Sequence, residues 1–217
     1  MTKPKNILVL MTDQQRFDSL GCYGNQHAIT PNLDRLAAAG TLFEACYVQS
    51  PICAPNRATY ATGLYPHNHG LWANGVGLPQ TLPLLSRALA DAGYDCGMVG
   101  KQHLGPMAGC NEEPRLNDGY RVYRWSHGPN HPSTVNAFHA WLREHHPAIH
   151  KAAILDQPPR GMEGNNSAKM SVPLDKVPVE AHYSHWIAQE TIDFIEDPMR
   201  DQDKPFYFMS NFFDPHH

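Results

Sequence analysis

The segment SPICAPNRATYATG, residues 50–63, brings together a cysteine and an arginine that could do chemistry. Its pattern predicts a short helix over residues 55–62 with Cys53 at the N-terminus and Gly63 as the stop. Unpaired amides at a helix N-terminus favour negative charge, and Arg57, four residues on, faces the same side as Cys53. Two interpretations remain open on these grounds. Cys53 is a nucleophile beside an anion-binding arginine, or it is a structural cysteine whose neighbouring arginine pairs with an acid.

Polar residues also follow three apolar stretches that we predict to be strands. Residues 6–11 lead to Asp13 and Gln14, residues 95–99 lead to Lys101 and His103, and residues 205–210 lead to Asp214, His216 and His217. For one such cluster, a polar loop after a strand is the simpler explanation. Ligands in open α/β sheets bind beyond the carboxyl ends of the strands, so three clusters together predict one shared active site.

The elements that must position these residues alternate between strands and helices, which predicts an α/β domain with a mainly parallel sheet. The continuous apolar run at residues 6–11 is typical of a strand covered on both faces. The other predicted elements are a strand at residues 41–47 and helices at residues 30–40, 81–93, 133–145 and 179–196. Residues 105–132 and 157–178 are rich in Pro, Gly and Asn, and we expect them to be long loops that line a site.

Composition excludes several classes of protein. The 217 residues carry a net charge of −4 and no run of Lys or Arg, which argues against nucleic acid and anionic membranes as partners. The five cysteines show no CxxC pair, so neither a disulfide framework nor a zinc knuckle is predicted. The apolar run near the N-terminus is too short for a signal peptide or a membrane span. We therefore expect a cytoplasmic protein, or a periplasmic one if a leader has been removed.

The stretch CAPNRATYATG resembles the C-x-P-x-R signature, followed by T-G, of type I sulfatases in the alkaline phosphatase superfamily. Five matches at fixed spacing make this signature highly specific. The segments LGCYGN, TPNLDRLAAAG, GLYPHNHG, GKQHLG and PFYFMSNFFDPHH also resemble the family, so the likeness covers almost the whole chain. It implies an alkaline-phosphatase-like fold with helices on both faces of the sheet, and the hydrolysis of sulfate esters.

The resemblance also implies a modified residue. In the family the signature cysteine is oxidised to formylglycine, whose hydrated aldehyde is the nucleophile, and Cys53 would be that residue. A formylglycine-generating enzyme would be a partner and would recognise Pro55 and Arg57. Arg57 would then hold the matured group, and the hydrate at Cys53 would also be a metal ligand.

Further roles follow from the same likeness. Asp13 and Gln14 would bind a divalent cation, usually Ca²⁺, which prefers oxygen ligands. Lys101 would contact the formylglycine and the sulfate. His103 would hold one hydroxyl of the hydrate and act as a base, and His216 would bind sulfate or protonate the leaving oxygen. The substrate would be a small-molecule or carbohydrate sulfate ester.

The sequence departs from the family pattern in two places, which affect the expected substrate and the expected extent of the domain. Many sulfatases have a second acid where this chain has Gln14, and glutamine there is similar to phosphonate monoester hydrolases and phosphodiesterases of the superfamily. The Lys101 and His103 pair is similar to true sulfatases, so sulfate esters rank first. The family also expects a later Asp-Asn or Asp-His metal pair, a late lysine and a C-terminal subdomain. We therefore expect residues 1–217 to be an incomplete N-terminal catalytic domain.

Two other classes of function compete with hydrolysis. The chain could be a non-catalytic fragment that binds oxyanions, or a redox thiol protein, although Cys46 is seven residues from Cys53 and is a poor candidate for a resolving cysteine. Four further residues are candidates for the pocket, with a structural or surface role favoured for each: Trp72, Asn74, His127 and His131.

Overall fold

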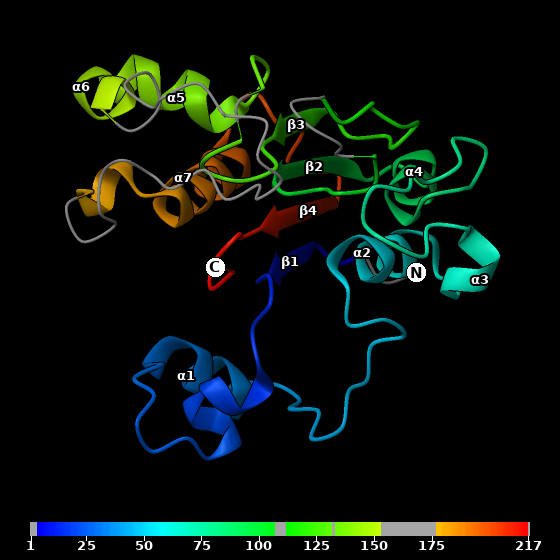
Figure 1. Ribbon diagram of the computed structural model, residues 1–217, viewed down its shortest axis with the longest axis horizontal. Helices are drawn as coiled ribbons and strands as arrows, with labels where there is room; N and C mark the ends of the chain where they lie inside the picture. The colour runs from blue at the N-terminus through cyan, green and yellow to red at the C-terminus, as the bar shows by residue number, and fades with distance from the viewer. Residues whose placement is uncertain (1–3, 107–111, 132, 153–176, 217) are drawn as a thin grey trace, which may run out of the picture.

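A four-stranded parallel sheet forms the centre of the computed structural model, which describes residues 4–106, 112–131, 133–152 and 177–216 (Figure 1). The strands are β1 (Ile7–Met11), β2 (Asp95–Gly100), β3 (Val122–Trp125) and β4 (Phe206–Asn211), in the order β1-β4-β2-β3. The last residues of all four strands lie in register, because Asn211 pairs with both Met11 and Gly100, and Gly100 pairs with Trp125. The predicted parallel α/β sheet is therefore confirmed, with its carboxyl ends at one edge.

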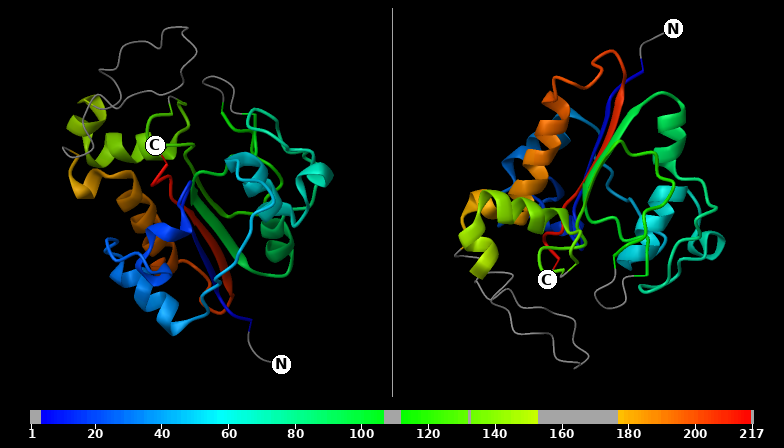
Figure 2. Two further views of the ribbon diagram at one scale, coloured as in Figure 1. Left: turned by 60° about the horizontal axis from the view of Figure 1, so that its bottom comes forward. Right: turned by 90° about the horizontal axis from the view of Figure 1, so that it is seen from above.

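Helices cover both faces of the sheet, as Figure 2 shows. One face carries α5 (Ala137–His145), α6 (Pro147–His150) and α7 (Tyr183–Glu196), and the other carries α2 (Cys53–Thr62), α3 (Pro66–His69) and α4 (Leu85–Asp91). Helix α1 (Pro31–Ala39) lies below the sheet in the view of Figure 1. Of the helices in the described part of the chain, none has the length and hydrophobicity needed to cross a bilayer.

Strand β4 shows why the centre of the sheet is stable. Phe206 and Phe208 point toward α7, where Phe194 packs beside them, while Tyr207 and Met209 point to the opposite face. All six residues of the strand are buried. Fully burying a Phe side chain stabilises the fold by about 1.5–3 kcal/mol, so this strand contributes strongly to the core near the site.

Strand β1 differs from the prediction that both of its faces are covered. Ile7, Val9 and Met11 pack against the cluster around Tyr207, but Leu8 and Leu10 are 43% and 53% exposed. They lie on the α7 side of the sheet, and α7 packs mainly on β2 and β4 among the strands described. The prediction of two covered faces is wrong for this strand, because an apolar run reveals a strand but not what packs against it.

Some other elements differ from their predicted bounds. Residues 41–47 form no strand, and Leu42, Phe43 and Tyr47 are exposed there, with no neighbouring strand described for them to pair with. Conversely, β3 lies inside the predicted loop at residues 105–132. It is short and carries exposed Arg124, so its sequence lacks the apolar signal of a buried strand.

Three helices begin later than predicted, at positions set by a proline or by a capping side chain. Helix α4 begins at Leu85 rather than residue 81, two residues after Pro83. The Asn136 side chain accepts a hydrogen bond from Phe138 N at 3.1 Å and starts α5 four residues later than predicted. His182 similarly caps α7, after a separate short helix, η5 (Val179–Ala181). Most of the second predicted loop, residues 157–176, lies outside the described residues.

Candidate active site

The aligned strand ends bring three charged side chains into contact. Asp13 lies two residues beyond β1, Lys101 directly follows β2, and Arg57 reaches the same point from α2. The Asp13 Oδ2 atom is 2.6 Å from Lys101 Nζ and 3.2 Å from Arg57 Nη2. All three side chains are buried, so their charges act on one another with little screening by water.

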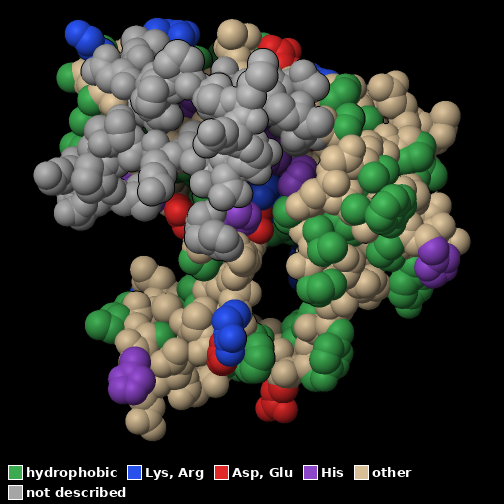
Figure 3. All heavy atoms as spheres, in the orientation of Figure 1, with side chains coloured by type: hydrophobic (Ala, Val, Ile, Leu, Met, Phe, Trp, Pro, Cys, Tyr) green, Lys and Arg blue, Asp and Glu red, His purple; other side chains and the backbone are tan. Residues whose placement is uncertain are grey.

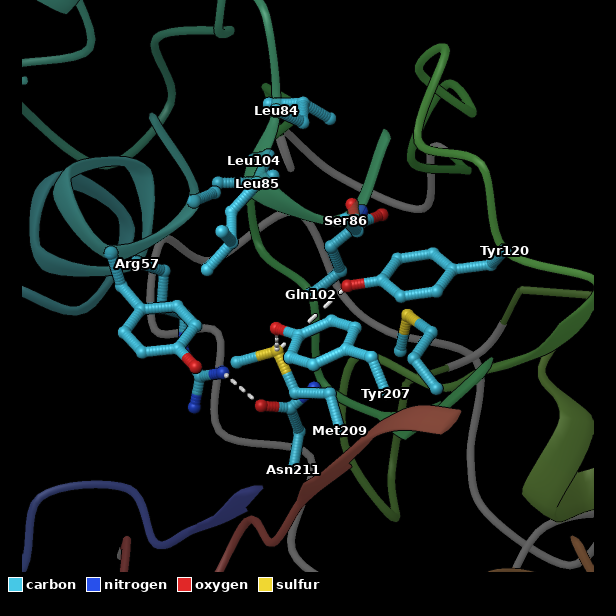
Figure 4. A pocket seen from close by; sticks show the side chains of 13 residues that line it. Arg57, Leu84, Leu85, Ser86, Gln102, Leu104, Tyr120, Tyr207, Met209 and Asn211 are labelled. Atoms are coloured by element: carbon cyan, nitrogen blue, oxygen red, sulfur yellow. Dashed lines mark hydrogen bonds between the residues drawn. The ribbon is translucent and has the colours of Figure 1, made fainter. Parts of the chain in front are cut away.

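Arg57 joins the ends of three strands. Its Nη1 atom donates to the backbone oxygen of Lys101 at 2.6 Å and to Oδ1 of Asn211 at 3.2 Å (Figure 4), while Nη2 reaches Asp13. The strands approach closely here. A Cβ atom on Gly100, whose φ is +92°, would lie 2.1 Å from the backbone oxygen of Asn211, so only glycine fits. The guanidinium fork therefore holds β1, β2 and β4 together.

A small cavity lies beside this junction, bounded by Arg57, Tyr120, Tyr207 and Met209 (Figure 4). Its volume is about 20 Å³, which is room for roughly one water molecule. It is too small to admit a substrate, so it is not the candidate site.

The charged group favours anions. One carboxylate and two cations give the trio Asp13, Lys101 and Arg57 a net charge of about +1 at neutral pH. Burial alone would raise the pKa of Asp13, but the positive charges of Lys101 and Arg57 outweigh it and hold that pKa below its ordinary value. The carboxylate is therefore ionised, and the uncompensated positive charge would attract a negatively charged ligand.

An open cleft of about 730 Å³ lies beside the trio, and Figure 3 shows a hollow between the part of the chain that carries α1 and the rest of the molecule. Cys53, the first residue of α2, lines the cleft. Its Sγ atom donates to Asn74 Oδ1 at 3.4 Å, and the same oxygen accepts from Ala54 N at 3.2 Å. The other lining residues are Met11, Thr12, Asp13, Gln14, Gln15, Val48, Ser50, Pro51, Ile52, Asn56, Arg57 and His216.

Lys101 and His103 are not among the residues that line this cleft. Lys101 reaches it through the ion pair with Asp13. The His103 ring is buried with its centroid 4.5 Å from that of His127, and neither Nδ1 atom has a hydrogen-bond partner among the residues the structure describes. Burial, followed by the charges of Lys101 and Arg57, lowers the pKa of His103 to about 3, so its imidazole is neutral.

Backbone strain marks two of the predicted site residues. Gln14 and His103 have φ values of 60° and 58°, the left-handed region that non-glycine residues rarely adopt. They are the two non-glycine residues with positive φ within the described ranges. Such strain costs about 1–3 kcal/mol and persists only where the surroundings enforce it, which is typical of functional sites.

The loop after β4 supplies His216 to the cleft. Its ring packs at a tilt against Phe213 with centroids 4.6 Å apart, and Lys101 Nζ lies 5.2 Å from the centroid of the same Phe213 ring. Asp214 accepts a hydrogen bond from Ser184 at the start of α7. His217 lies outside the described residues.

The predicted metal ligands line the same cleft. Asp13, Gln14 and Cys53 all line the cleft, and carboxylate and amide oxygens suit a hard cation such as Ca²⁺. Calcium takes about 6–8 oxygen ligands, more than these residues supply. Across the described ranges, no three His, Cys, Asp or Glu side chains gather into a group that could hold a metal. The donor chemistry fits, but the set is incomplete.

The sequence did not single out Asn211 or Glu113, and it favoured a structural or surface role for Asn74. Asn211 is the last residue of β4, whereas the sequence places its polar cluster only beyond that strand. Glu113 lies in the predicted loop, yet its buried carboxylate accepts from the backbone of His103 at 2.9 Å. Asn74 had a structural role favoured, but it contacts Cys53. The sequence signal that could have pointed to Asn74 is the Asn-Gly pair that it begins, two residues after Trp72. The Trp72 side chain is exposed.

Comparison with known proteins gives a consistent result. The Sulfatase family model matches residues 5–217. The uncharacterised sulfatase YidJ of Escherichia coli is 30% identical over 220 residues, and an arylsulfatase of Clostridium perfringens is 30% identical over 218 residues. The matches cover 99% and 97% of this chain but 39% and 43% of those relatives, so the chain spans about two fifths of their length.

Solved structures share the fold. A phosphonate monoester hydrolase of Agrobacterium radiobacter superposes with a TM-score of 0.72 at 24% identity, over 99% of this chain and 42% of that one. A protein solved in complex with its substrate, D-glucosamine-2-N,6-O-disulfate, has a TM-score of 0.66 at 24% identity, over 98% of this chain and 35% of that one. At this identity the likeness shows the fold and no more.

Proposed function

The chain belongs to the sulfatase family, and we propose that the protein hydrolyses sulfate esters with Cys53, matured to formylglycine, as its nucleophilic residue. The observation that carries the proposal is the position of Cys53. It begins α2 at the wall of the cleft, one helical turn before Arg57, which belongs to a buried group of net positive charge. A helix N-terminus beside an uncompensated cation favours a sulfate oxyanion at that point.

In this proposal, different side chains of the site bind the sulfate and take part in proton transfer. The positive charge of Arg57 and Lys101 draws in the sulfate and offsets charge on the transferring group. His103 is neutral, so a ring nitrogen can accept a hydrogen bond from a hydroxyl of the hydrate, and His216 on the cleft wall is placed to contact the leaving oxygen. Formylglycine would supply a hydrated aldehyde, with one hydroxyl to attack sulfur and a second to release the sulfate.

We infer that Asp13 and Gln14, with the matured residue at position 53, hold a divalent cation, with Ca²⁺ as the expected ion. What supports this is that the three residues line one cleft and that Asp13 is ionised. The cation would add positive charge next to the sulfate. The remaining ligands would come from residues outside those three.

A sulfated carbohydrate or a small aryl sulfate is the proposed substrate. The cleft of about 730 Å³ is within the range of small-molecule sites. One protein of the same fold was solved with a glucosamine disulfate, and one relative is an arylsulfatase. Because the chain spans about two fifths of its relatives, the activity proposed is that of the whole protein.

Phosphonate monoester or phosphodiester hydrolysis is the second candidate. Gln14 on the cleft wall favours it, as does the fold shared with a phosphonate monoester hydrolase. A non-catalytic fragment is the third. The relatives, together with Lys101 and His103, favour the sulfate ester.

The test is to co-express the whole protein with a formylglycine-generating enzyme and to compare it with Cys53→Ala and Cys46→Ser. We expect the intact mass to show loss of the Cys53 thiol, and aryl sulfate to be hydrolysed faster than aryl phosphonate. Cys46 is exposed, so Cys46→Ser should behave like the unsubstituted protein. Faster phosphonate hydrolysis would select the second candidate. An unmodified Cys53 thiol together with no hydrolysis of either ester would select the third.

A further inference from the structure

Glu113 is a buried acid that the proposed chemistry does not use. Its side chain is 8% exposed, and its two oxygens accept four N–H groups. Oε2 accepts from His103 N at 2.9 Å and from Trp125 Nε1 at 2.8 Å, while Oε1 accepts from Gly105 N at 2.9 Å and from Leu104 N. Three consecutive backbone amides therefore converge on one carboxylate, an arrangement that binds anions strongly.

The backbone of residues 103–105, in the loop after β2, packs closely around the Glu113 carboxylate. A Cβ atom on Gly105 would lie 2.8 Å from Glu113 Cγ and 2.9 Å from Pro114 Cδ, so a larger residue would displace Glu113. His103, at the other end of the amide run, holds its left-handed φ of 58°. A strained backbone needs an external restraint, and the Glu113 hydrogen bonds to residues 103–105 supply one.

Glu113 also connects the loop after β2 to the end of β3. Trp125 is the last residue of β3, and His127, two residues further, contacts the His103 ring. One carboxylate thus restrains the His103 backbone directly and the segment that carries His127 through the Trp125 indole. Burial raises the pKa of Glu113 above its ordinary value, and the four N–H donors offset only part of that rise.

We propose that Glu113 is a positioning residue that fixes the His103 imidazole for proton transfer, an inference that rests on the proposed sulfatase function. Without the carboxylate, the 103–105 amides lose their common acceptor and the His103 backbone relaxes toward an unstrained conformation. The imidazole then moves relative to the group it serves. In the proposed function, sulfate binding depends on Arg57 and Lys101, and neither forms a hydrogen bond or ion pair with Glu113 in the described part of the chain, so it should persist.

Asp118 provides a matched control. It is also a buried acid between β2 and β3, and it accepts from Tyr120 N at 2.9 Å and pairs with Arg115. It makes no hydrogen bond to residues 101–105 among those described. Glu113→Gln and Asp118→Asn therefore each replace a buried carboxyl group by an amide, and only the first replaces one that holds the His103 loop.

The experiment measures kcat and KM on an aryl sulfate, melting temperature, and the imidazole NMR signals of His103, assigned with a His103→Gln variant. In the whole, matured protein we expect Glu113→Gln to lower kcat about 10- to 100-fold, the cost of misplacing a catalytic group by about 1 Å. KM should change less than about threefold, because the oxyanion-binding cations remain. The His103 signals should shift. Asp118→Asn should lower the melting temperature but leave kcat and the His103 signals unchanged.

Several outcomes would overturn the proposal. A Glu113→Gln protein that is less stable but keeps kcat and the His103 signals would show a purely structural role, as would equal effects in Asp118→Asn. If the parent protein hydrolyses no sulfate ester, the proposed function fails, and the NMR comparison still decides whether Glu113 positions His103. Should Glu113→Gln not fold, Trp125→Phe removes one donor and keeps the charge. It should shift the His103 signals by a smaller amount, and no shift would refute the restraint.

Discussion

Two regions of the molecule form the cleft, the buried strand ends with helix α2 and the segment of residues 14–52 that contains α1. In the first, Arg57, Lys101 and Asn211 are each at least 95% buried and joined by short hydrogen bonds. In the second, large apolar side chains such as Leu36, Phe43 and Tyr47 are exposed. Residues on the first side are therefore held in place by the core, while those on the second add little to its stability.

Asp13 connects the two regions, because it leaves β1 and pairs with both cations of the first region. The contrast in burial between the two regions indicates that the charged part of the site is built into the hydrophobic core. The wall formed by Gln14 and residues 48–52 is built outside it. Substitutions on the two sides should accordingly differ in size, and the following predictions run from the largest effect to the smallest.

Arg57→Ala should have the largest effect on stability. It leaves Lys101 O and Asn211 Oδ1 without their donor and removes the tie between three strands. Breaking a buried ion pair costs about 3–5 kcal/mol, so urea unfolding should show a loss of that size in the free energy of unfolding. Arg87→Ala, which breaks an exposed pair with Asp91, is the control and should change stability little. A loss for Arg57→Ala under about 1 kcal/mol would show that the junction is not part of the core.

Asp13→Asn should cost about 2–3 kcal/mol, the value of hydrogen bonds to charged groups, because it leaves two buried cations facing each other. The folded pKa of Asp13 lies below its ordinary value of 3.8. Its stabilisation is therefore complete above pH 3.8 and is lost as the pH falls through the folded pKa. Unfolding measured from neutral to acid pH should show the parent and variant converging at low pH. A constant difference would contradict the ion-pair origin.

His127→Gln should make the protein less sensitive to acid. Burial, followed by the neighbouring His103, lowers the pKa of His127 to about 2, against an ordinary value of 6.5. Between these values the unfolded chain binds a proton that the folded chain does not. Stability is thus complete above pH 6.5 and falls as the pH drops, by up to about 1.4 kcal/mol per pH unit. The variant should lose the part of that slope that His127 contributes in urea unfolding, whereas His27→Gln, on an exposed histidine, should keep the slope of the parent protein.

Leu36→Ala should have the smallest effect, under about 0.5 kcal/mol, because the side chain is 62% exposed. Leu142→Ala in the cluster beneath α7 is the matched comparison and should cost about 2–5 kcal/mol. Thermal unfolding of the two variants side by side measures the contrast. Equal losses would show that the segment around α1 is packed as tightly as the core.

Sequence alone determined the elements whose signals are local. The apolar runs located β2 and β4 to within a residue, and Thr-Pro and Gly positions bounded α1 and the end of α2. The spacing of Cys53, Pro55 and Arg57 led to the family that the comparison established. These succeed because caps, turns and a sequence signature depend on neighbours only a few residues apart.

Tertiary structure decided what depends on distant partners. Nothing near Asn211 or Glu113 in the chain marks them as partners of Arg57 and His103, 154 and 10 residues away. Likewise the exposure of Leu8 and Leu10, and the absence of a strand at residues 41–47, follow from what packs beside them. Hydrogen bonds and burial between remote segments exist only once the strands align, so this part of the site could be seen only in the fold.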